Sequence, residues 1–219
     1  MSISAIIWDW NGTLLDDVNY AIGCMNQLLA KRKMPILNRD RYREIFGFPV
    51  ESYYRRLGFD FEAEAFIALS REFINCYYGK LAVPEPHIGA RQLVEDLSGA
   101  GVSQAILSAM ELGPLHEQLA ANDFLDLFVL IHGLNHIHAS SKIDEGRQLL
   151  NRLGQKGEAV LYIGDTTHDL EVAEALSVKS VILTHGHQSA DQFQDAGSEL
   201  LESFDELREY LRVQQGIRV

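Results

Sequence analysis

The sequence contains few cysteines, few prolines and little positive charge. Its 219 residues include five prolines and only two cysteines, Cys24 and Cys76. Two distant cysteines exclude a disulfide framework and show none of the spacings of a zinc site. Lysine and arginine number 19 against 31 aspartates and glutamates, which gives a net charge of −12. This balance argues against nucleic acid or an anionic membrane as the main partner, because both attract basic proteins.

Long hydrophobic runs are absent as well. No stretch approaches the length of about 18 apolar residues that a membrane span needs, so no contact with a membrane is expected. The N-terminal residues lack the basic and apolar regions of a signal peptide. Together with the low cysteine content, this favours a cytoplasmic protein. A hydrophobic content of 47% is typical of a folded domain and excludes the disordered classes.

Short apolar runs alternate with helical patterns along most of the chain. Strands are predicted at 3–8, 105–107, 127–131, 159–163 and 178–183. Helices are predicted at 89–100, 112–122, 142–153 and 167–176, and after a capping Ser203. Repeated strand–helix–strand units imply parallel pairing. The sequence therefore predicts an α/β fold with a doubly wound, mostly parallel sheet.

The long gap between the first two strands shows only helical patterns. The simplest interpretation is a helical domain inserted at 16–82 into an α/β core made of 1–15 and 83–219. Asp16 and Asp17 stand where this insert begins, and we expect them to cap its first helix.

Polar residues follow the predicted strand ends. Asp9 and Asp165 come directly after strands, and Asp169 lies one helical turn beyond Asp165. Ser108 also follows a strand, and Lys142 opens the helix after the third strand. In open α/β sheets the ligand crevice lies outside the carboxyl ends of the strands, so these side chains should converge. Such a set suits phosphoryl transfer, with carboxylate oxygens as ligands for Mg²⁺.

Four motifs in these segments resemble those of the haloacid dehalogenase superfamily. Residues 9–14, Asp-Trp-Asn-Gly-Thr-Leu after an apolar strand, look like its first motif. Ser108 matches the second motif, Lys142 the third, and residues 164–169 the fourth, a GDxxxD pattern. The helical insert is similar to the cap of the phosphoglycolate phosphatase-like branch. The resemblance implies a Rossmann-like core and an Mg²⁺-dependent phosphohydrolase of a small phosphorylated metabolite.

The resemblance also implies a role for each matched residue. Asp9 would attack phosphorus and form an aspartyl-phosphate, with Thr13 supporting its loop and Lys142 assisting. Residues expected to hold the phosphoryl group are Gly12, Ser108, Ala109 and Lys142. Mg²⁺ would be bound by Asp9, the backbone carbonyl of Asn11, Asp165 and, directly or through water, Asp169.

Asn11 departs from the family pattern. Most phosphatases of the family carry an aspartate there, which protonates the leaving alcohol and then activates water. An amide has no titratable proton near neutral pH and cannot replace it. The loss of general acid–base catalysis slows a reaction by about 10²–10⁴-fold, or about 3–5 kcal/mol on the barrier. The effect should be smallest for leaving groups that need no proton, such as phenolates.

The predicted cap contains a basic segment. Residues 31–56 carry eight basic and three acidic side chains, a local charge of +5. Tyr53 and Arg55 in this segment are candidates for contact with the anionic substrate. The alternative is that the charges belong to a solvated helix face.

Several histidines resemble parts of a site. His132, His136 and His138 lack the fixed spacing of a helical metal site and are read as polar loop residues. His185 and His187 follow the last predicted strand, and a role near the crevice stays open for both. His168 is an alternative source of the proton that Asn11 cannot supply.

Four other functions are also considered. A catalytically weak protein that binds a phosphorylated metabolite would also fit Asn11. A phosphonatase or phosphomutase could use the same scaffold, and a phosphonatase would need a Schiff-base lysine in the cap, where Lys31, Lys33 and Lys80 are available. A true haloacid dehalogenase needs no metal, and the pair Asp165 and Asp169 argues against it.

Overall fold

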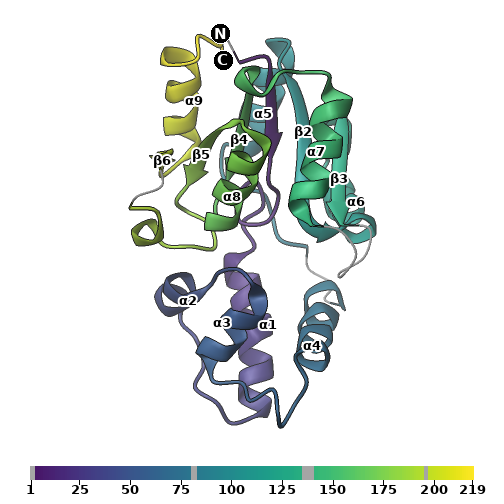
Figure 1. Cartoon of the computed structure of the whole chain (residues 1–219), viewed down its shortest axis with the longest axis vertical. Coiled ribbons are helices and arrows are strands. Elements are labelled where there is room, and N and C mark those ends of the chain that lie inside the picture. Colours follow the sequence, from purple (N-terminus) through teal and green to yellow (C-terminus); the bar gives the residue numbers. More distant parts are fainter. Residues whose placement is uncertain (1–2, 80–82, 135–140, 195–196) are drawn as a thin grey trace.

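The centre of the molecule is a six-stranded parallel sheet with helices on both faces (Figure 1). The computed structural model describes residues 3–79, 83–134, 141–194 and 197–219. The strand order is β3-β2-β1-β4-β5-β6, and every neighbouring pair is parallel. The strands are β1 (Ala5–Trp8), β2 (Ser103–Glu111), β3 (Leu130–Leu134), β4 (Val160–Gly164), β5 (Lys179–Leu183) and β6 (Glu199–Leu201).

Both faces of the sheet are buried, which explains why the strands are continuously apolar. Successive side chains of a strand point to opposite faces. Ala5 and Ile7 of β1 therefore pack under α7 (Lys142–Leu153) and α8 (Thr167–Leu176). The alternate residues Ile6 and Trp8 pack under α5 (Ala90–Gly99), α6 (Leu112–Ala121) and α9 (Phe204–Val213). The predicted doubly wound α/β fold is confirmed.

Of the helices described between β1 and β2 in the chain, the first four gather at one end of the sheet (Figure 1). They are α1 (Val18–Lys31), α2 (Arg39–Ile45), α3 (Val50–Leu57) and α4 (Phe66–Gly79). They stand beyond the carboxyl ends of the strands, over the edge where the sequence places its polar residues. None of the described helices is long and apolar enough to cross a membrane.

The observed elements differ from the predicted ones in three places. The strand predicted at 127–131 starts later, because Leu125–Leu127 form a 3-10 turn and β3 begins at Leu130. β2 extends well beyond 105–107 on both sides. The edge strand β6 was not predicted, since it has only three residues and two of them are exposed.

The two cysteines are distant in sequence but adjacent in the fold. Cys24 in α1 and Cys76 in α4 have Sγ atoms 2.6 Å apart, and they form no disulfide. Their sequence separation gave no sign of this, because α1 and α4 pack against each other only in the folded helical insert.

Candidate active site

The candidate site lies where the strand order reverses at the middle of the sheet. From β1 the chain builds outward through β2 to β3, then crosses to β4 on the other side of β1. Trp8, the last residue of β1, pairs with Ile163 of β4, so Asp9 and Asp165 leave the sheet side by side. Such a switch point is where open α/β sheets bind ligands.

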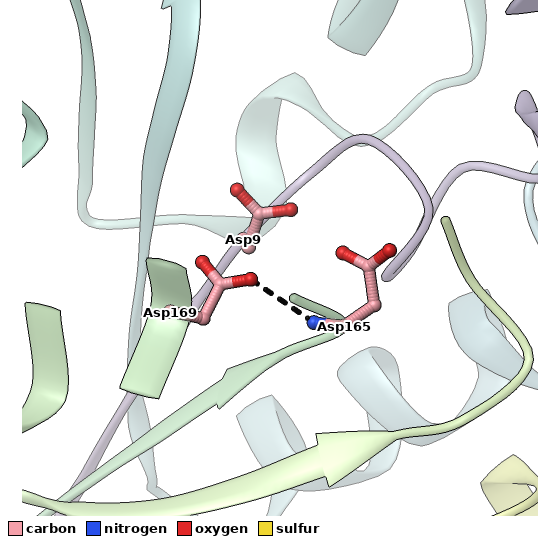
Figure 2. Close-up of side chains that lie close together, drawn as sticks. All are labelled: Asp9, Asp165 and Asp169. Carbon is pink, nitrogen blue, oxygen red and sulfur yellow. Dashed lines mark hydrogen bonds between the residues drawn. The ribbon is translucent and has the colours of Figure 1, made fainter. Parts of the chain in front are cut away.

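Three buried aspartates converge at this point. One carboxylate oxygen each from Asp9, Asp165 and Asp169 lies within 4.8 Å of the others. Figure 2 shows the three carboxylates around a shared space, with the Asp165 backbone N–H donating to Asp169 Oδ2 at 3.1 Å. The predicted convergence of these three residues is thus present in the structure.

Lys142 joins two of these carboxylates from the first turn of α7. Its Nζ donates to Asp9 Oδ1 at 2.5 Å and to Asp169 Oδ1 at 2.6 Å. Ser141 caps α7 by accepting from the Asp144 backbone N–H, which fixes where the lysine emerges. Burial opposes the charge of Lys142, but Asp169 and Asp9 raise its pKa well above the ordinary value. The ammonium is therefore a permanent positive charge in the site.

The pKa values of the three aspartates are shifted in different directions by their surroundings. Burial raises the pKa of Asp9 to about 6, although Lys142 opposes this shift. Burial raises the pKa of Asp165 to about 8, against the opposing charge of His187. Burial also disfavours ionised Asp169, but Lys142 outweighs it and lowers that pKa. The site thus has more buried acid than its one lysine neutralises, which is the electrostatic condition for binding a cation.

The loop after β1 positions Thr13 between two carboxylates. Thr13 Oγ1 lies 3.2 Å from Asp9 Oδ2 and 3.0 Å from Asp165 Oδ1. The tight path of this loop depends on Gly12, which has φ +75° and where a Cβ would stand 2.3 Å from Asp165 Oδ2. A side chain at position 12 would therefore displace Asp165.

Asp169 both caps α8 and contacts Lys142. Its Oδ2 accepts from the Thr166 backbone N–H at 2.9 Å, as a capping carboxylate does. Its Oδ1 accepts from Lys142 and, at 3.0 Å, from the Tyr162 hydroxyl. Helix capping thus holds the carboxylate in place at the site.

Ser108 and Ala109 border the same space from β2. Both line the cavity that contains the three aspartates. Ser108 is 1% exposed, and its Oγ accepts from the Met110 backbone N–H at 3.1 Å. Its hydroxyl hydrogen is left to donate to a ligand.

Asn11 belongs to a hydrogen-bond network that the sequence did not reveal. Its Nδ2 donates to Asp17 Oδ2 at 3.1 Å and to the Tyr77 hydroxyl at 2.9 Å. Tyr77 in turn donates to Asp17 Oδ2 at 2.5 Å, and the Gly12 backbone N–H donates to Asp17 Oδ1 at 2.8 Å. His187 Nε2 lies 3.1 Å from Asp17 Oδ1. The amide that replaces the expected carboxyl is therefore firmly held.

Asp17 is the centre of this network and does not cap α1 through its side chain. It stands at the expected N-cap position of α1, and its backbone carbonyl accepts from the Ala21 N–H, but its carboxylate makes no capping hydrogen bond. Burial disfavours its charge, yet His187 and the hydrogen bonds from His187, Tyr77 and Asn11 lower its pKa. Burial likewise opposes protonated His187, but Asp17 raises its pKa to about 9. The two form a buried ion pair beside Asn11.

Comparison with known proteins agrees with these motifs. A sequence model described as "Haloacid dehalogenase-like hydrolase" matches residues 6–183. The chain belongs to the haloacid dehalogenase-like hydrolases. It is 24% identical over 208 residues to "Probable phosphatase IndB" of Dickeya dadantii, covering 92% of this chain and 90% of that protein. It is 26% identical over 204 residues to the phosphoglycolate phosphatase of Caulobacter vibrioides, covering 84% of this chain and 80% of that protein.

Solved structures of the family share the fold of this hydrolase. A haloacid dehalogenase-like family hydrolase from Streptococcus pneumoniae superimposes with a TM-score of 0.81 at 21% identity. The match covers 95% of this chain and 98% of that chain. The arrangement of the α/β core and the helical insert is therefore one already observed in this family.

The basic side chains of residues 31–56 do not line the cavity of the hydrolase. Among the described residues 31–56, none of the eight basic side chains lines it. Arg55 pairs with Glu51 and lies over the ring of Phe61, so the structure places it outside, whereas Tyr53 lines the cavity. Most of these basic side chains form ion pairs within the helical insert or donate hydrogen bonds to the core.

Arg43 is the main contact of this segment with the core. Its Nε donates to the Gly186 carbonyl at 2.8 Å, and its guanidinium also reaches the carbonyls of Thr184 and Gln188. Arg39 donates to the His185 carbonyl at 3.0 Å. These bonds fasten α2 to the loop after β5.

The histidines of the hydrolase fall into two groups. His132 pairs with Glu145 beneath α7, away from the carboxylates, and His136 and His138 lie outside the described residues. His168 pairs with Glu171 and does not line the cavity, whereas His187 does. Of the two histidines after β5, His187 lines the cavity, whereas His185 does not line it and lies with its Nε2 3.3 Å from the Thr13 carbonyl oxygen.

The donor set of the hydrolase fits a hard divalent cation. Asp9, Asp165 and Asp169 offer carboxylate oxygens and no soft ligand. Burial raises the pKa values of Asp9 and Asp165, so a cation in the shared space would offset the cost of ionising them.

Proposed function

We propose that this hydrolase is an Mg²⁺-dependent phosphatase that acts on a small phosphorylated metabolite through an aspartyl-phosphate on Asp9. The observation that carries the proposal is the convergence of Asp9, Asp165, Asp169 and Lys142 at one buried point. We further propose that residues 16–82 act as a cap over a core of 1–15 and 83–219, and that the protein works in the cytoplasm.

Phosphoryl transfer would start with Asp9. One carboxylate oxygen of Asp9 forms a bond to phosphorus while the phosphorus–oxygen ester bond breaks, and the electron pair leaves with the alcohol oxygen. Lys142 and Ser108 hold the equatorial phosphoryl oxygens, where charge is concentrated. Water then cleaves the aspartyl-phosphate, which frees phosphate and regenerates Asp9.

Mg²⁺ would be held by Asp9, Asp165, the backbone carbonyl of Asn11 and Asp169, and it would supply positive charge next to the transferring group. Thr13 keeps the carboxylates of Asp9 and Asp165 in position through its contacts with both. Asn11 supplies no proton, so the leaving group must depart as an anion or take its proton from solvent.

Phosphate release is the direct test. With Mg²⁺ and phenyl phosphate, the wild-type protein should release phosphate, and removal of Mg²⁺ by EDTA should stop the reaction. Asp9→Asn should lower kcat by several orders of magnitude, because an amide cannot attack phosphorus. The matched control is Asp123→Asn, since this side chain is 86% exposed and its backbone at φ +58° also suits asparagine. Full activity in Asp9→Asn or in EDTA would refute the proposal.

Asn11 supports a second candidate function, the binding of a phosphorylated metabolite with little turnover. The same experiment separates the two, because a binding protein would retain ligand without releasing phosphate from any activated ester. A phosphonatase has less support. Lys31 pairs with Glu72, neither Lys31 nor Lys33 lines the cavity, and Lys80 lies outside the described residues.

A further inference from the structure

The cavity next to the carboxylates has an aromatic wall. It is continuous with the candidate active site and has a volume of about 230 Å³. The helical insert contributes most of its lining, including Phe46, Phe48, Tyr53, Tyr54, Phe73 and Tyr77. Such a wall suits the flat apolar face of a ring far better than a polyhydroxylated chain.

The cavity offers no charge for a second anionic group. Among the described residues, the cationic side chains that line it are Lys142 and His187. Lys142 is engaged by Asp9 and Asp169, and His187 by Asp17. A substrate with a further carboxylate or phosphate would bury that charge without a partner, which is strongly unfavourable. The part of the substrate beyond its phosphoryl group should therefore be uncharged.

One polar atom in the wall has no partner. Tyr53 is 2% exposed, and its hydroxyl makes no hydrogen bond to any described residue. Its ring is fixed edge-on against Tyr42 at 5.8 Å, Phe46 at 5.2 Å and Tyr54 at 5.8 Å between centroids. Buried hydroxyls are normally satisfied. Tyr53 lines a ligand-sized cavity, so a polar group on the ligand is the partner that its hydroxyl would gain after a small displacement of the surrounding side chains.

The volume limits the size of the ligand. A dry protein cavity of roughly 150 Å³ is large enough for benzene. The 230 Å³ here must hold the phosphoryl group as well. One ring and one phosphoryl group fit this space, and a larger ligand would have to extend out of the cavity.

We infer that the substrate is the phosphate monoester of a single-ring aromatic alcohol or phenol, with its ring against the cap aromatics and a polar ring substituent on the Tyr53 hydroxyl. This rests on the proposed phosphatase function and names its substrate class. Asn11 is consistent with this substrate class for a separate reason. A phenolate, whose conjugate acid has a pKa of about 10, can leave without a general acid.

Binding of phosphonates tests this inference without requiring turnover, because their carbon–phosphorus bond is not cleaved by attack on phosphorus as a phosphate ester is. Calorimetry with Mg²⁺ would compare benzylphosphonate with 3-phosphonopropionate, which resembles phosphoglycolate and carries a second charge. We expect benzylphosphonate to bind at least about tenfold more tightly. The three ring isomers of hydroxybenzylphosphonate should include one that binds more tightly than benzylphosphonate itself.

Tyr53→Phe provides the residue-level test because it keeps the ring and removes only the hydroxyl. The variant should lose about two- to tenfold in affinity for the preferred hydroxybenzylphosphonate and none for benzylphosphonate. Arg55→Gln, on the same helix but outside the cavity lining, should change neither affinity.

Two outcomes separate this inference from the proposed function. If the protein releases phosphate from acetyl phosphate or phosphoglycolate but binds 3-phosphonopropionate as tightly as benzylphosphonate, the substrate class is wrong and the phosphatase function stands. If benzylphosphonate binds selectively and no ester is hydrolysed, the ligand class stands and the phosphatase function is wrong. If Tyr53→Phe lowers the affinity for both aromatic phosphonates equally, the Tyr53 hydroxyl does not have the assigned role.

Discussion

A single amide distinguishes this site from the family pattern. Asn11 donates to both Asp17 and Tyr77, so its amide group is oriented by two buried partners. The same partners explain how asparagine is accommodated, because Asp17 is a carboxylate that accepts a hydrogen bond. An aspartate at position 11 would instead face a like charge. The residue is therefore matched to its neighbours as well as deficient in acid–base chemistry.

Asn11→Asp should restore general acid–base catalysis where the leaving group needs a proton. We expect turnover of an alkyl phosphate to rise on the order of 10²-fold, with a much smaller change for phenyl phosphate. The measurement is kcat for both substrates with Mg²⁺. Asn11→Ala is the matched control, because it removes the amide without adding a carboxyl, and its alkyl-to-aryl ratio should stay low. Equal wild-type rates on both esters, unchanged by Asn11→Asp, would contradict this account.

The elements that carry local signals could be predicted from the sequence. The helices at 142–153 and 167–176 were predicted with their observed bounds, since Ser141 and Thr166 mark their first turns. Asp9 and Asp165 were recognised because each directly follows an apolar strand. These features depend on neighbouring residues, which is why sequence patterns reveal them.

Contacts between distant elements could not be predicted in this way. Asp17 and His187 are 170 positions apart, and Asn11 and Tyr77 are 66 positions apart. Asp17 was expected to cap a helix, and Tyr77 lies in the segment that shows only helical patterns. Only the docking of α1, α4 and the loop after β5 brings them together. Arg55 is a different case, because its partner Glu51 lies four residues earlier on the same helix, and a net charge summed over residues 31–56 does not show this local pair.

Helices α1 and α4 can be linked through Cys24 and Cys76. Oxidised glutathione should accept two electrons from the two thiols and leave a disulfide between the helices, because their Sγ atoms lie 2.6 Å apart. The link should raise the free energy of unfolding by about 2–4 kcal/mol, which thermal denaturation with and without dithiothreitol would measure. Cys76→Ser is the control and should show no redox dependence. If mass spectrometry shows that both thiols remain after oxidation, this result would contradict the proximity of the two Sγ atoms.

At the scale of the whole molecule, the two parts of the fold provide different parts of the chemistry. The α/β core supplies the carboxylates and Lys142, from the segments that follow its strands, and the helical insert supplies the aromatic residues that line the rest of the cavity. Arg43 and Tyr42 of α2 reach the loop after β5, where Tyr42 Oη lies 2.8 Å from His187 Nδ1. These contacts hold the carboxylates of the core and the aromatic residues of the insert together.

The central claim is that Asp9 becomes phosphorylated, and mass spectrometry of the acid-quenched enzyme tests it most directly. Phenyl phosphate should load Asp9 rapidly, because phenolate leaves without a proton. The aspartyl-phosphate should then persist, since Asn11 cannot activate the water that cleaves it. The account predicts a phosphoryl mass increment on the peptide containing Asp9, which requires Mg²⁺ and decays faster in Asn11→Asp. A phosphoryl group on another residue, or phosphate release with no modified enzyme at any time after mixing, would contradict it.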